Sequence, residues 1–298
     1  MKILVTGSTG FVGRNLMPLL IKEKHHVLEI TRNEQKSQSL FGESTQKYQI
    51  TDDQEALKLA IRQFNPEIAI HLAALLTSSD DYESMQKLLN SNLIFLCRIL
   101  DALKESQLKL FVNTGTFAEY YNGNEVLDPA YLYAATKIAS RTFVDYYSKT
   151  YKYKQITIVP YTIYGGQDSQ KKIMDIIFDS IKSDVPTDLS PGNQILDFIH
   201  IDDVVNLYAR VIDSVDSLPP KAAIQAGTGE GTSLKQLAII IEEITGEKTN
   251  INWGGKSYRN SDVMYAVADI SGLNKLLNWQ PSISLKLGIE KYLIKKFN

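Results

Sequence analysis

A glycine pattern directly behind the first apolar run limits the choice of fold more than any other part of the sequence. Residues 2–6 form a short apolar run, and a helical pattern follows from Phe11 to about Glu23. This order predicts a strand, a tight turn and a helix. The turn and the start of the helix contain Gly7, Gly10 and Gly13, spaced three residues apart. Glycines at this spacing let the backbone approach a diphosphate closely, and the N-terminus of the helix favours the negative charge of the diphosphate. A plain turn is the alternative, but the context favours dinucleotide binding by Gly7, Thr9, Gly10, Phe11, Val12 and Gly13.

The alternation of short apolar runs with longer helical patterns continues to about residue 160. Strands alternating with helices of this length predict a parallel sheet covered on both faces. We therefore expect an α/β fold with a doubly wound, Rossmann-type parallel sheet. The further strands are expected at 26–30, 68–72, 108–113 and 156–159, and the further helices at 56–64, 83–105 and 131–151.

After Tyr164 the predicted strands and helices become shorter, and Gly, Pro and Asp interrupt them. Residues 197–203 nevertheless resemble a strand that feeds a helix, which would return the chain to the first lobe. We expect the two lobes to interleave. The predicted dinucleotide-binding domain comprises 1–164 and about 195–226, and the predicted substrate lobe comprises about 165–194 and 227–298.

Charge and cysteine content exclude several classes of protein. In 298 residues, 32 basic and 34 acidic side chains leave a net charge of -2, which is too little positive charge for a nucleic-acid or membrane partner. The single cysteine, Cys97, cannot form an internal disulfide, and four histidines without paired cysteines argue against a metal site. Gly7 comes too early for a signal-peptide core, and no run approaches the roughly 18 apolar residues of a spanning helix. We expect a cytoplasmic protein.

The end of the second predicted strand bears on the choice of cofactor. An acidic residue that binds an adenosine ribose is expected near position 31, but the sequence there is Thr31 followed by Arg32. An arginine can pair with the 2′-phosphate of NADP, which a carboxylate would repel. The sequence therefore favours NADP(H) over NAD(H). In the alternative, Arg32 is a solvated charge and Glu29 takes the ribose role.

Two hydroxyls and a lysine form the predicted catalytic set. Tyr133 and Lys137 are four residues apart and so share one face of a helix. A neighbouring positive charge is expected to lower the pKa of the phenol and ease proton exchange. Thr116 follows the strand at 108–113 and is placed at the carboxyl edge of the sheet, where ligands of such folds bind. A Tyr and a Lys at this spacing are common on surface helices. The glycine loop earlier in the chain favours the interpretation that these two residues belong to a catalytic site.

These features together resemble the extended short-chain dehydrogenases/reductases, in the group of nucleotide-sugar epimerases, dehydratases and ketoreductases. The resemblance implies that Tyr133 is the general acid/base, that Lys137 tunes it and binds the ribose, and that Thr116 holds the substrate oxygen. It further implies that the cofactor is lined by Gln49, Ile50, Leu72, Ala73, Ala74, Thr114, Pro160 and Ile163. The segments that carry it are 6–13, 71–74, Tyr133 with Lys137, 160–165, 197–203 and 227–233.

Departures from the family pattern narrow the expected reaction. Phe117 and Ala118 stand where sugar dehydratases of this family carry proton-transferring residues, so a dehydratase is disfavoured. Gln49 stands where the family usually has an acidic residue that contacts adenine. Leu196 stands where the family often has an arginine that contacts the diphosphate. Arg259 is a candidate to bind the substrate diphosphate; in the alternative, it is a charged residue at the surface. The candidates for touching the sugar are Thr77, Tyr161 and Thr162, each of which could instead support the loop that carries it.

The sequence as a whole predicts an NADPH-dependent reductase acting on a keto group, at C4, of a nucleotide-activated deoxysugar. Residues 116–120 resemble 4-ketoreductases that make deoxyhexoses for surface polysaccharides. The alternatives are an NAD(P)-dependent nucleotide-sugar epimerase and a non-catalytic NADP-binding regulator. The resemblance also implies a homodimer formed by the helices at 83–105 and 131–151, although their apolar residues could all face the sheet. His71 is expected near the cofactor or in the core, and not as a base.

Overall fold

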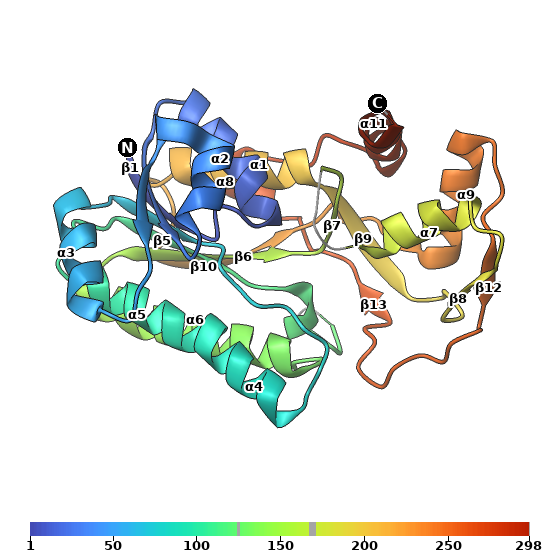
Figure 1. Cartoon of the computed structure of the whole chain (residues 1–298), viewed down its shortest axis with the longest axis horizontal. Coiled ribbons are helices and arrows are strands. Elements are labelled where there is room, and N and C mark those ends of the chain that lie inside the picture. Colours follow the sequence, from blue (N-terminus) through green and yellow to red (C-terminus); the bar gives the residue numbers. More distant parts are fainter. Residues whose placement is uncertain (124–125, 167–170, 298) are drawn as a thin grey trace.

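The computed structural model describes residues 1–123, 126–166 and 171–297 and contains a parallel sheet of seven strands (Figure 1). The expected Rossmann-type α/β fold is confirmed. The strand order reverses next to β1, so the loops after β1 and β4 diverge at the carboxyl edge and leave a crevice there. In spatial order the strands are β10 (Lys221–Ala226), β6 (Lys154–Pro160), β5 (Leu110–Thr114), β4 (Ile68–His71), β1 (Lys2–Thr6), β2 (His26–Thr31) and β3 (Gln46–Gln49).

Helices cover both faces of this sheet because successive strand residues point to opposite sides. Ile3 and Val5 pack in one core, under α1 (Phe11–Lys22) and α8 (Ile201–Asp213). Leu4 packs in a second core on the other side. The helices over that second core are α3 (Gln54–Phe64), α5 (Phe95–Ala102) and α6 (Leu132–Tyr151).

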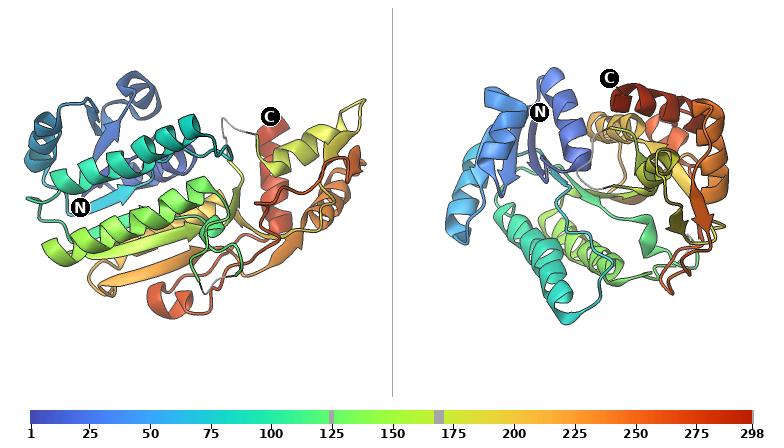
Figure 2. Two further views of the ribbon diagram at one scale, coloured as in Figure 1. Left: turned by 90° about the horizontal axis from the view of Figure 1, so that it is seen from below. Right: turned by 45° about the vertical axis from the view of Figure 1, so that its right-hand side comes forward.

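A smaller lobe stands beside the carboxyl edge of the large sheet (Figures 1 and 2). Its strand β9 (Ile195–His200) lies in a second sheet of four strands, while α8 and β10 return the chain to the large sheet. The second sheet also contains β7 (Thr162–Tyr164), β11 (Gly231–Ser233) and β13 (Tyr265–Ala266), and β8 (Thr187–Leu189) pairs with β12 (Ile251–Trp253). The lobe's helices are α7 (Ile173–Ile181), α9 (Leu234–Thr245) and α11 (Leu285–Phe297), and α10 (Leu273–Leu277) packs on the first core.

The side chain of Asp197 connects two loops of this lobe. Its buried carboxylate accepts hydrogen bonds from the N–H groups of Thr228, Gly229 and Ala268 and from the Thr228 hydroxyl. One carboxylate thereby fixes two loops that are distant in sequence, which is the structural role of this part of the motif at 197–203. Within the described residues, no helix is long and apolar enough to cross a membrane.

One helix was not predicted from the sequence, and one predicted helix was wrong in part. The polar stretch 32–46 contains a short helix, α2 (Glu34–Phe41), whose first turn is capped by the Asn33 side chain. The helix expected over 83–105 is three segments, α4 (Tyr82–Leu88), a π-helical turn η2 (Leu89–Ile94) and α5. Periodicity does not reveal a π turn because it inserts a single extra residue in a continuous helix.

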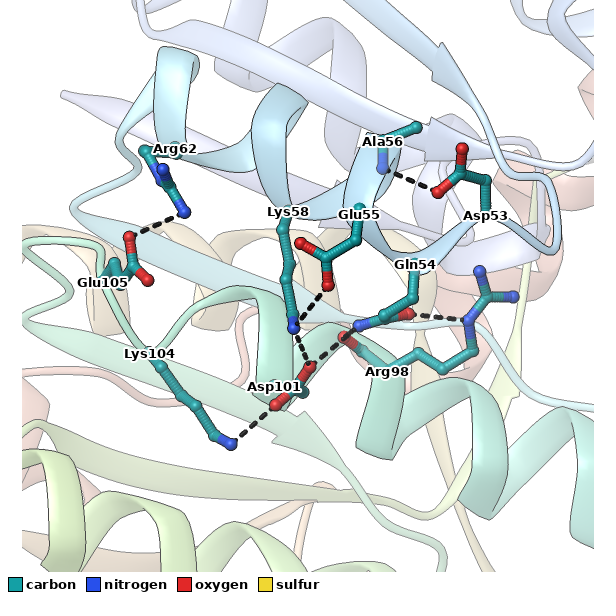
Figure 3. Close-up of polar contacts among 10 residues, drawn as sticks. All are labelled: Asp53, Gln54, Glu55, Ala56, Lys58, Arg62, Arg98, Asp101, Lys104 and Glu105. Atoms are coloured by element: carbon teal, nitrogen blue, oxygen red, sulfur yellow. Dashed lines mark hydrogen bonds and ion pairs between the residues drawn. The ribbon is translucent and has the colours of Figure 1, made fainter.

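Polar side chains fasten α5 to α3 along one side (Figure 3). Asp101 is the centre, because its carboxylate pairs with Lys104 at 2.6 Å and with Lys58 at 3.2 Å. Gln54 donates to the same carboxylate and accepts a hydrogen bond of 2.9 Å from Arg98. These contacts pair the polar side chains at the end of α5 with those of α3. The preceding turn, η2, has the exposed apolar side chains Leu89 and Ile94.

Candidate active site

The glycine loop packs directly against the end of β4. Gly7 has φ +73°, and a Cβ there would lie 2.6 Å from the amide nitrogen of Ala73. A Cβ on Gly13 would lie 2.3 Å from the carbonyl oxygen of Gly7, so the first turn of α1 also rests on the loop. A larger residue at Gly7 would separate the loop from Leu72 and Ala73, which the sequence assigns to the cofactor site, and one at Gly13 would separate α1 from the loop.

The start of α1 fits a bound diphosphate. Gly10 is the N-cap of α1 and provides no side-chain cap, so the N–H groups of the first turn remain available to an anion. A Cβ on Gly10 would meet only the Gly7 carbonyl within 4 Å, which leaves open space above the loop. The Ser8 hydroxyl is buried with no hydrogen-bond partner among the described residues. Thr9, Phe11 and Val12 belong to this same turn.

The end of β2 places Arg32 at the surface and turns Glu29 inward. No described residue forms an ion pair or hydrogen bond with Arg32, which is exposed directly after the strand. Glu29 is fully buried, and its carboxylate accepts hydrogen bonds from Ser37, at 2.6 Å, and from Thr45. The alternative that gave Glu29 a ribose role therefore does not fit, because α2 and the following turn already occupy its carboxylate.

The end of β3 lies alongside Arg32. Gln49 pairs with Thr31 in the strand register and is exposed. The amide of Ile50 donates a 2.8 Å hydrogen bond to the Thr31 carbonyl. Gln49 and Ile50, both assigned to the cofactor, thus lie at the same edge of the sheet as the glycine loop.

His71 is a structural residue at the end of β4. Its Nδ1 lies 2.9 Å from the hydroxyl of Thr6, and its ring lies near the rings of Phe95 and Phe111. Burial lowers the pKa of this imidazole to about 3, so it is neutral at physiological pH. Of the two roles expected for His71, the structure shows core packing. Ala74, two residues beyond Leu72, is exposed.

The next two strands bring further predicted residues to the edge. Thr114 ends β5, and its hydroxyl lies 2.8 Å from the hydroxyl of Tyr208 in α8. Pro160 ends β6, and Ile163 follows in β7; both are half-buried. These positions flank the crevice between the large sheet and the smaller lobe.

The predicted catalytic residues come from two neighbouring segments and are all nearly buried. Tyr133 lies in the first turn of α6 and Lys137 one turn later, with 9% and 3% of their surface exposed. Thr116 is the N-cap of the short helix η3 (Phe117–Glu119), and its hydroxyl oxygen accepts the N–H of Ala118 at 3.4 Å. The hydroxyl proton of Thr116 remains available to a substrate oxygen.

The protonation states of this set differ from the expectation. Burial raises the pKa of Tyr133, whereas the Tyr133–Lys137 spacing predicted a lowered one. Burial also lowers the pKa of Lys137 to about 8, because the ammonium is removed from water. Desolvation therefore determines the protonation of both groups, and Tyr133 is a protonated phenol at neutral pH.

Asn92 contributes to the site and was missed from the sequence. It is buried in the π turn, and its amide nitrogen donates 3.0 Å hydrogen bonds to the Leu75 carbonyl and to the Thr136 hydroxyl. Its amide oxygen accepts the Leu75 N–H at 2.8 Å. The loop after β4 is thereby tied to the helix that carries Tyr133. An asparagine within an apolar helical run was the available signal.

Glu119 and Arg141 form a buried pair that the sequence analysis also missed. The carboxylate accepts the N–H of Thr116 at 2.7 Å and lies 2.5 Å from the Arg141 Nε. The Thr-x-x-Glu spacing of 116–119 is a capping-box pattern and could have predicted the first contact. The partner Arg141 depends on the fold and has no local signal.

A cavity of about 540 Å³ lies between the two lobes, next to the catalytic segments. Thr77 comes to it from the loop after β4, and Arg259 from the segment before β13, as the sequence assignment of both to substrate requires. Tyr131, stacked on Tyr133 with ring centroids 6.0 Å apart, was not anticipated. The remaining lining residues are Leu76, Ser78, Phe117, Gln194, Leu196, Ser261, Asp262 and Val263.

Tyr161 and Thr162 do not line this cavity. Tyr161 is only 4% exposed, and its hydroxyl donates a 2.7 Å hydrogen bond to Gln225 while its ring stacks on Phe117. Thr162 is half-buried in β7, opposite Phe198. In the described structure both residues support the wall of the site.

Comparisons with known proteins agree with this geometry. The model of the NAD dependent epimerase/dehydratase family matches residues 3–227. The chain is 29% identical to CDP-abequose synthase of Yersinia pseudotuberculosis, over 89% of this chain and 91% of the relative. It is 27% identical to UDP-glucuronate 4-epimerase of Thermodesulfobacterium geofontis, over 97% and 94%. Its fold matches a UDP-glucuronic acid 4-epimerase structure from Bacillus cereus, with a TM-score of 0.88, 24% identity and full coverage of both chains.

Proposed function

Because the chain belongs to the NAD dependent epimerase/dehydratase family, we propose that it reduces a keto group, at C4, of a nucleotide-activated deoxysugar. The chain is an NAD(P)-dependent enzyme of the extended short-chain dehydrogenase/reductase type. The observation that carries the proposal is the buried set of Thr116, Tyr133 and Lys137, whose segments also supply Phe117 and Tyr131 to the wall of the inter-lobe cavity. We place the reaction in deoxysugar biosynthesis for surface polysaccharides, in the cytoplasm.

The chain's own groups suit a reduction. NADPH, when bound, supplies the hydride that reaches the keto carbon. The Thr116 hydroxyl donates a hydrogen bond to the keto oxygen, and Tyr133 transfers its proton to that oxygen as the carbon–oxygen π electrons move onto it. The raised pKa of Tyr133 keeps the phenol protonated at neutral pH, which is the form that a proton donor requires. Lys137, one turn further along the helix, stabilises the phenolate that remains.

The substrate proposed here is a CDP-linked 4-keto sugar. A relative over nearly the whole chain is named for a CDP-linked sugar, abequose. Arg259 can bind the substrate diphosphate with its guanidinium, while Thr77 faces the sugar from the opposite loop. Tyr161 and Thr162 support the wall behind them. The two-lobe division of the sequence analysis is retained as part of this proposal.

NADPH is the proposed cofactor because Arg32 stands unpaired among the described residues at the tip of β2. Arg32→Ala should raise the KM for NADPH by about 10- to 100-fold, since it removes charge-assisted hydrogen bonds to the 2′-phosphate. The KM for NADH should stay within about twofold, because NADH lacks that phosphate. Steady-state kinetics with both cofactors measure this, with exposed Arg210→Ala as the matched control. An equal change for NADH and NADPH would contradict the assignment.

The second candidate is an epimerase that acts on a nucleotide sugar. The observation in its favour is the 27% identity, over 97% of this chain, to a UDP-glucuronate 4-epimerase. Such an enzyme would oxidise and re-reduce one carbon with the same tyrosine and would keep its cofactor through turnover. A reductase must release its oxidised cofactor after every cycle.

The test is a panel of CDP-, dTDP- and GDP-linked 4-keto-6-deoxy sugars incubated with the protein and NADPH or NADH. Loss of NADPH absorbance in proportion to one added sugar supports the reductase and identifies the nucleotide. If no keto sugar consumes cofactor while a bound nicotinamide stays with the protein through purification, the reductase proposal falls and the epimerase replaces it.

A homodimer completes the proposal. Leu89 and Ile94 are exposed on η2, and Phe143 and Tyr146 are exposed on α6. The two helical segments are in contact, on one side of the large sheet (Figures 1 and 2). A second copy packing its own two helices here would bury these side chains, as a homodimer formed by the helices at 83–105 and 131–151 requires. Sedimentation equilibrium tests this, and a monomer at micromolar concentration would contradict it.

A further inference from the structure

Glu119 lies at the centre of the loop that carries Thr116. Its side chain is fully buried, and one carboxylate oxygen accepts the Thr116 N–H at 2.7 Å. The Thr116 hydroxyl accepts the N–H of Ala118 in return, so a capping box closes the N-terminus of this one-turn helix. A Cβ on Gly115 would lie 2.5 Å from the same Glu119 oxygen, which shows how closely the backbone wraps the carboxylate.

Arg141 holds the other side of this carboxylate. It follows Lys137 by one turn of α6, and its Nε lies 2.5 Å from the second Glu119 oxygen. Its Nη1 donates a 3.1 Å hydrogen bond to the Tyr120 hydroxyl, and its guanidinium lies 5.5 Å from the centre of that ring. The arginine therefore joins the helix of Tyr133 and Lys137 to the segment of Thr116.

The pair also balances charge at the catalytic residues. The carboxylate of Glu119 favours the protonated forms of both Tyr133 and Lys137, and Arg141 opposes it at Lys137. The other titratable groups that face Tyr133 are Tyr131 and Tyr208. Burial raises the pKa of the Glu119 carboxyl and Arg141 opposes this rise, so the arginine keeps the group a carboxylate whose charge it offsets.

On the basis of the proposed reductase function, we propose that Glu119 and Arg141 are positioning residues of the active site. Glu119 fixes the backbone of Thr116 so that its hydroxyl faces the keto oxygen. Arg141 holds Glu119 and cancels its charge, so that the phenol of Tyr133 can lose its proton during turnover. Removing either partner then has two separable effects, one on geometry and one on charge.

The geometric effect is tested by Glu119→Ala against Glu119→Gln. Alanine removes the acceptor for the Thr116 N–H and should lower kcat by about 10- to 100-fold with a smaller change in KM, because a misplaced Thr116 acts mainly on the transition state. Glutamine keeps an oxygen acceptor and should restore most of kcat at the pH optimum. A glutamine variant as slow as the alanine variant would overturn the positioning role of Glu119.

The charge effect is tested by the pH dependence of kcat in the direction of reduction. Glu119→Gln removes a negative charge that favours the protonated forms of Tyr133 and Lys137 and leaves the positive charge of Arg141 alone, so the loss of activity at alkaline pH, where Lys137 deprotonates first, should move down by about one pH unit. Glu119→Gln combined with Arg141→Met removes both charges and should return this limb to its original position. Asp145→Asn makes the same charge change further along α6, at a half-buried carboxylate that pairs with the surface residues Lys149 and Lys221, and should leave the limb unmoved.

A readout without turnover separates this inference from the proposed function. NMR of the NADP⁺-saturated protein with ¹³C-labelled tyrosine follows the titration of Tyr133, whose signal is identified by its loss in Tyr133→Phe. The midpoint should fall in Glu119→Gln and return in the double variant, which stays testable even if Arg141→Met alone fails to fold. An unchanged midpoint would overturn the charge role. Shifted midpoints in a protein that reduces no keto sugar would sink the reductase proposal alone.

Discussion

Replacing Tyr133 with phenylalanine is expected to lower keto-sugar reduction by about a thousandfold while NADPH binding stays unchanged. The substitution removes the proton donor and keeps the ring, which is nearly buried and stacks on Tyr131. Hydride transfer would then leave an alkoxide with only the Thr116 hydrogen bond to stabilise it. Stopped-flow measurement of NADPH oxidation and a fluorescence titration of NADPH give the two quantities.

Tyr146→Phe is the control for this prediction. Tyr146 lies on the same helix and is exposed, so removal of its hydroxyl should change neither quantity. Retained turnover in Tyr133→Phe would contradict the assigned role of the phenol. Unchanged biological activity of that variant, together with intact NADP binding, would instead support a non-catalytic NADP-binding regulator.

Replacing Gly13 with alanine is the second large expected effect. The new Cβ would lie 2.3 Å from the Gly7 carbonyl and 2.6 Å from the Ser8 carbonyl. Both neighbours are backbone, so α1 or the loop must move, and such overpacking costs about 1–3 kcal/mol of folding free energy. The displaced loop should weaken NADPH binding by at least about 100-fold, since backbone N–H groups must meet the diphosphate closely. Calorimetric titration and urea unfolding measure the two effects.

Gly272→Ala provides the matched control. It makes the same chemical change at the N-cap of α10, where φ is -92° and a Cβ would meet nothing within 4 Å. This variant should bind NADPH and unfold as the parent protein does. If Gly13→Ala also bound NADPH with the parent affinity, the glycine loop could not be the diphosphate site.

The sequence predicted those parts of the fold that local patterns encode. Apolar runs of four to six residues located the main strands, and the glycines after Thr6 located the loop because their context is contiguous in the chain. The short helix α2 was missed because its stretch is polar and its stabilising contact, Ser37 with Glu29, crosses from helix to strand. The π turn at Leu89–Ile94 was missed because its apolar pattern continues that of the flanking helices.

Site residues could be predicted where they follow a strand directly or share a helix face with a partner close in sequence. Thr116 and Tyr133 follow from position and type, whereas Arg141 and Asn92 act through partners 22 and 17 residues away, Glu119 and Leu75. The protonation state of Tyr133 was wrong for a related reason. Spacing gives the neighbouring charge, but burial, which only the fold determines, decides the pKa.

The most direct test of a net reduction is the fate of deuterium carried on the nicotinamide. The protein is incubated with NADPH deuterated at the transferable position and with the CDP-linked 4-keto sugar, and the isolated sugar is examined by NMR and mass spectrometry. The proposal predicts one deuterium at C4 for each NADP⁺ formed. A sugar without deuterium, or turnover with no net formation of NADP⁺, would contradict it.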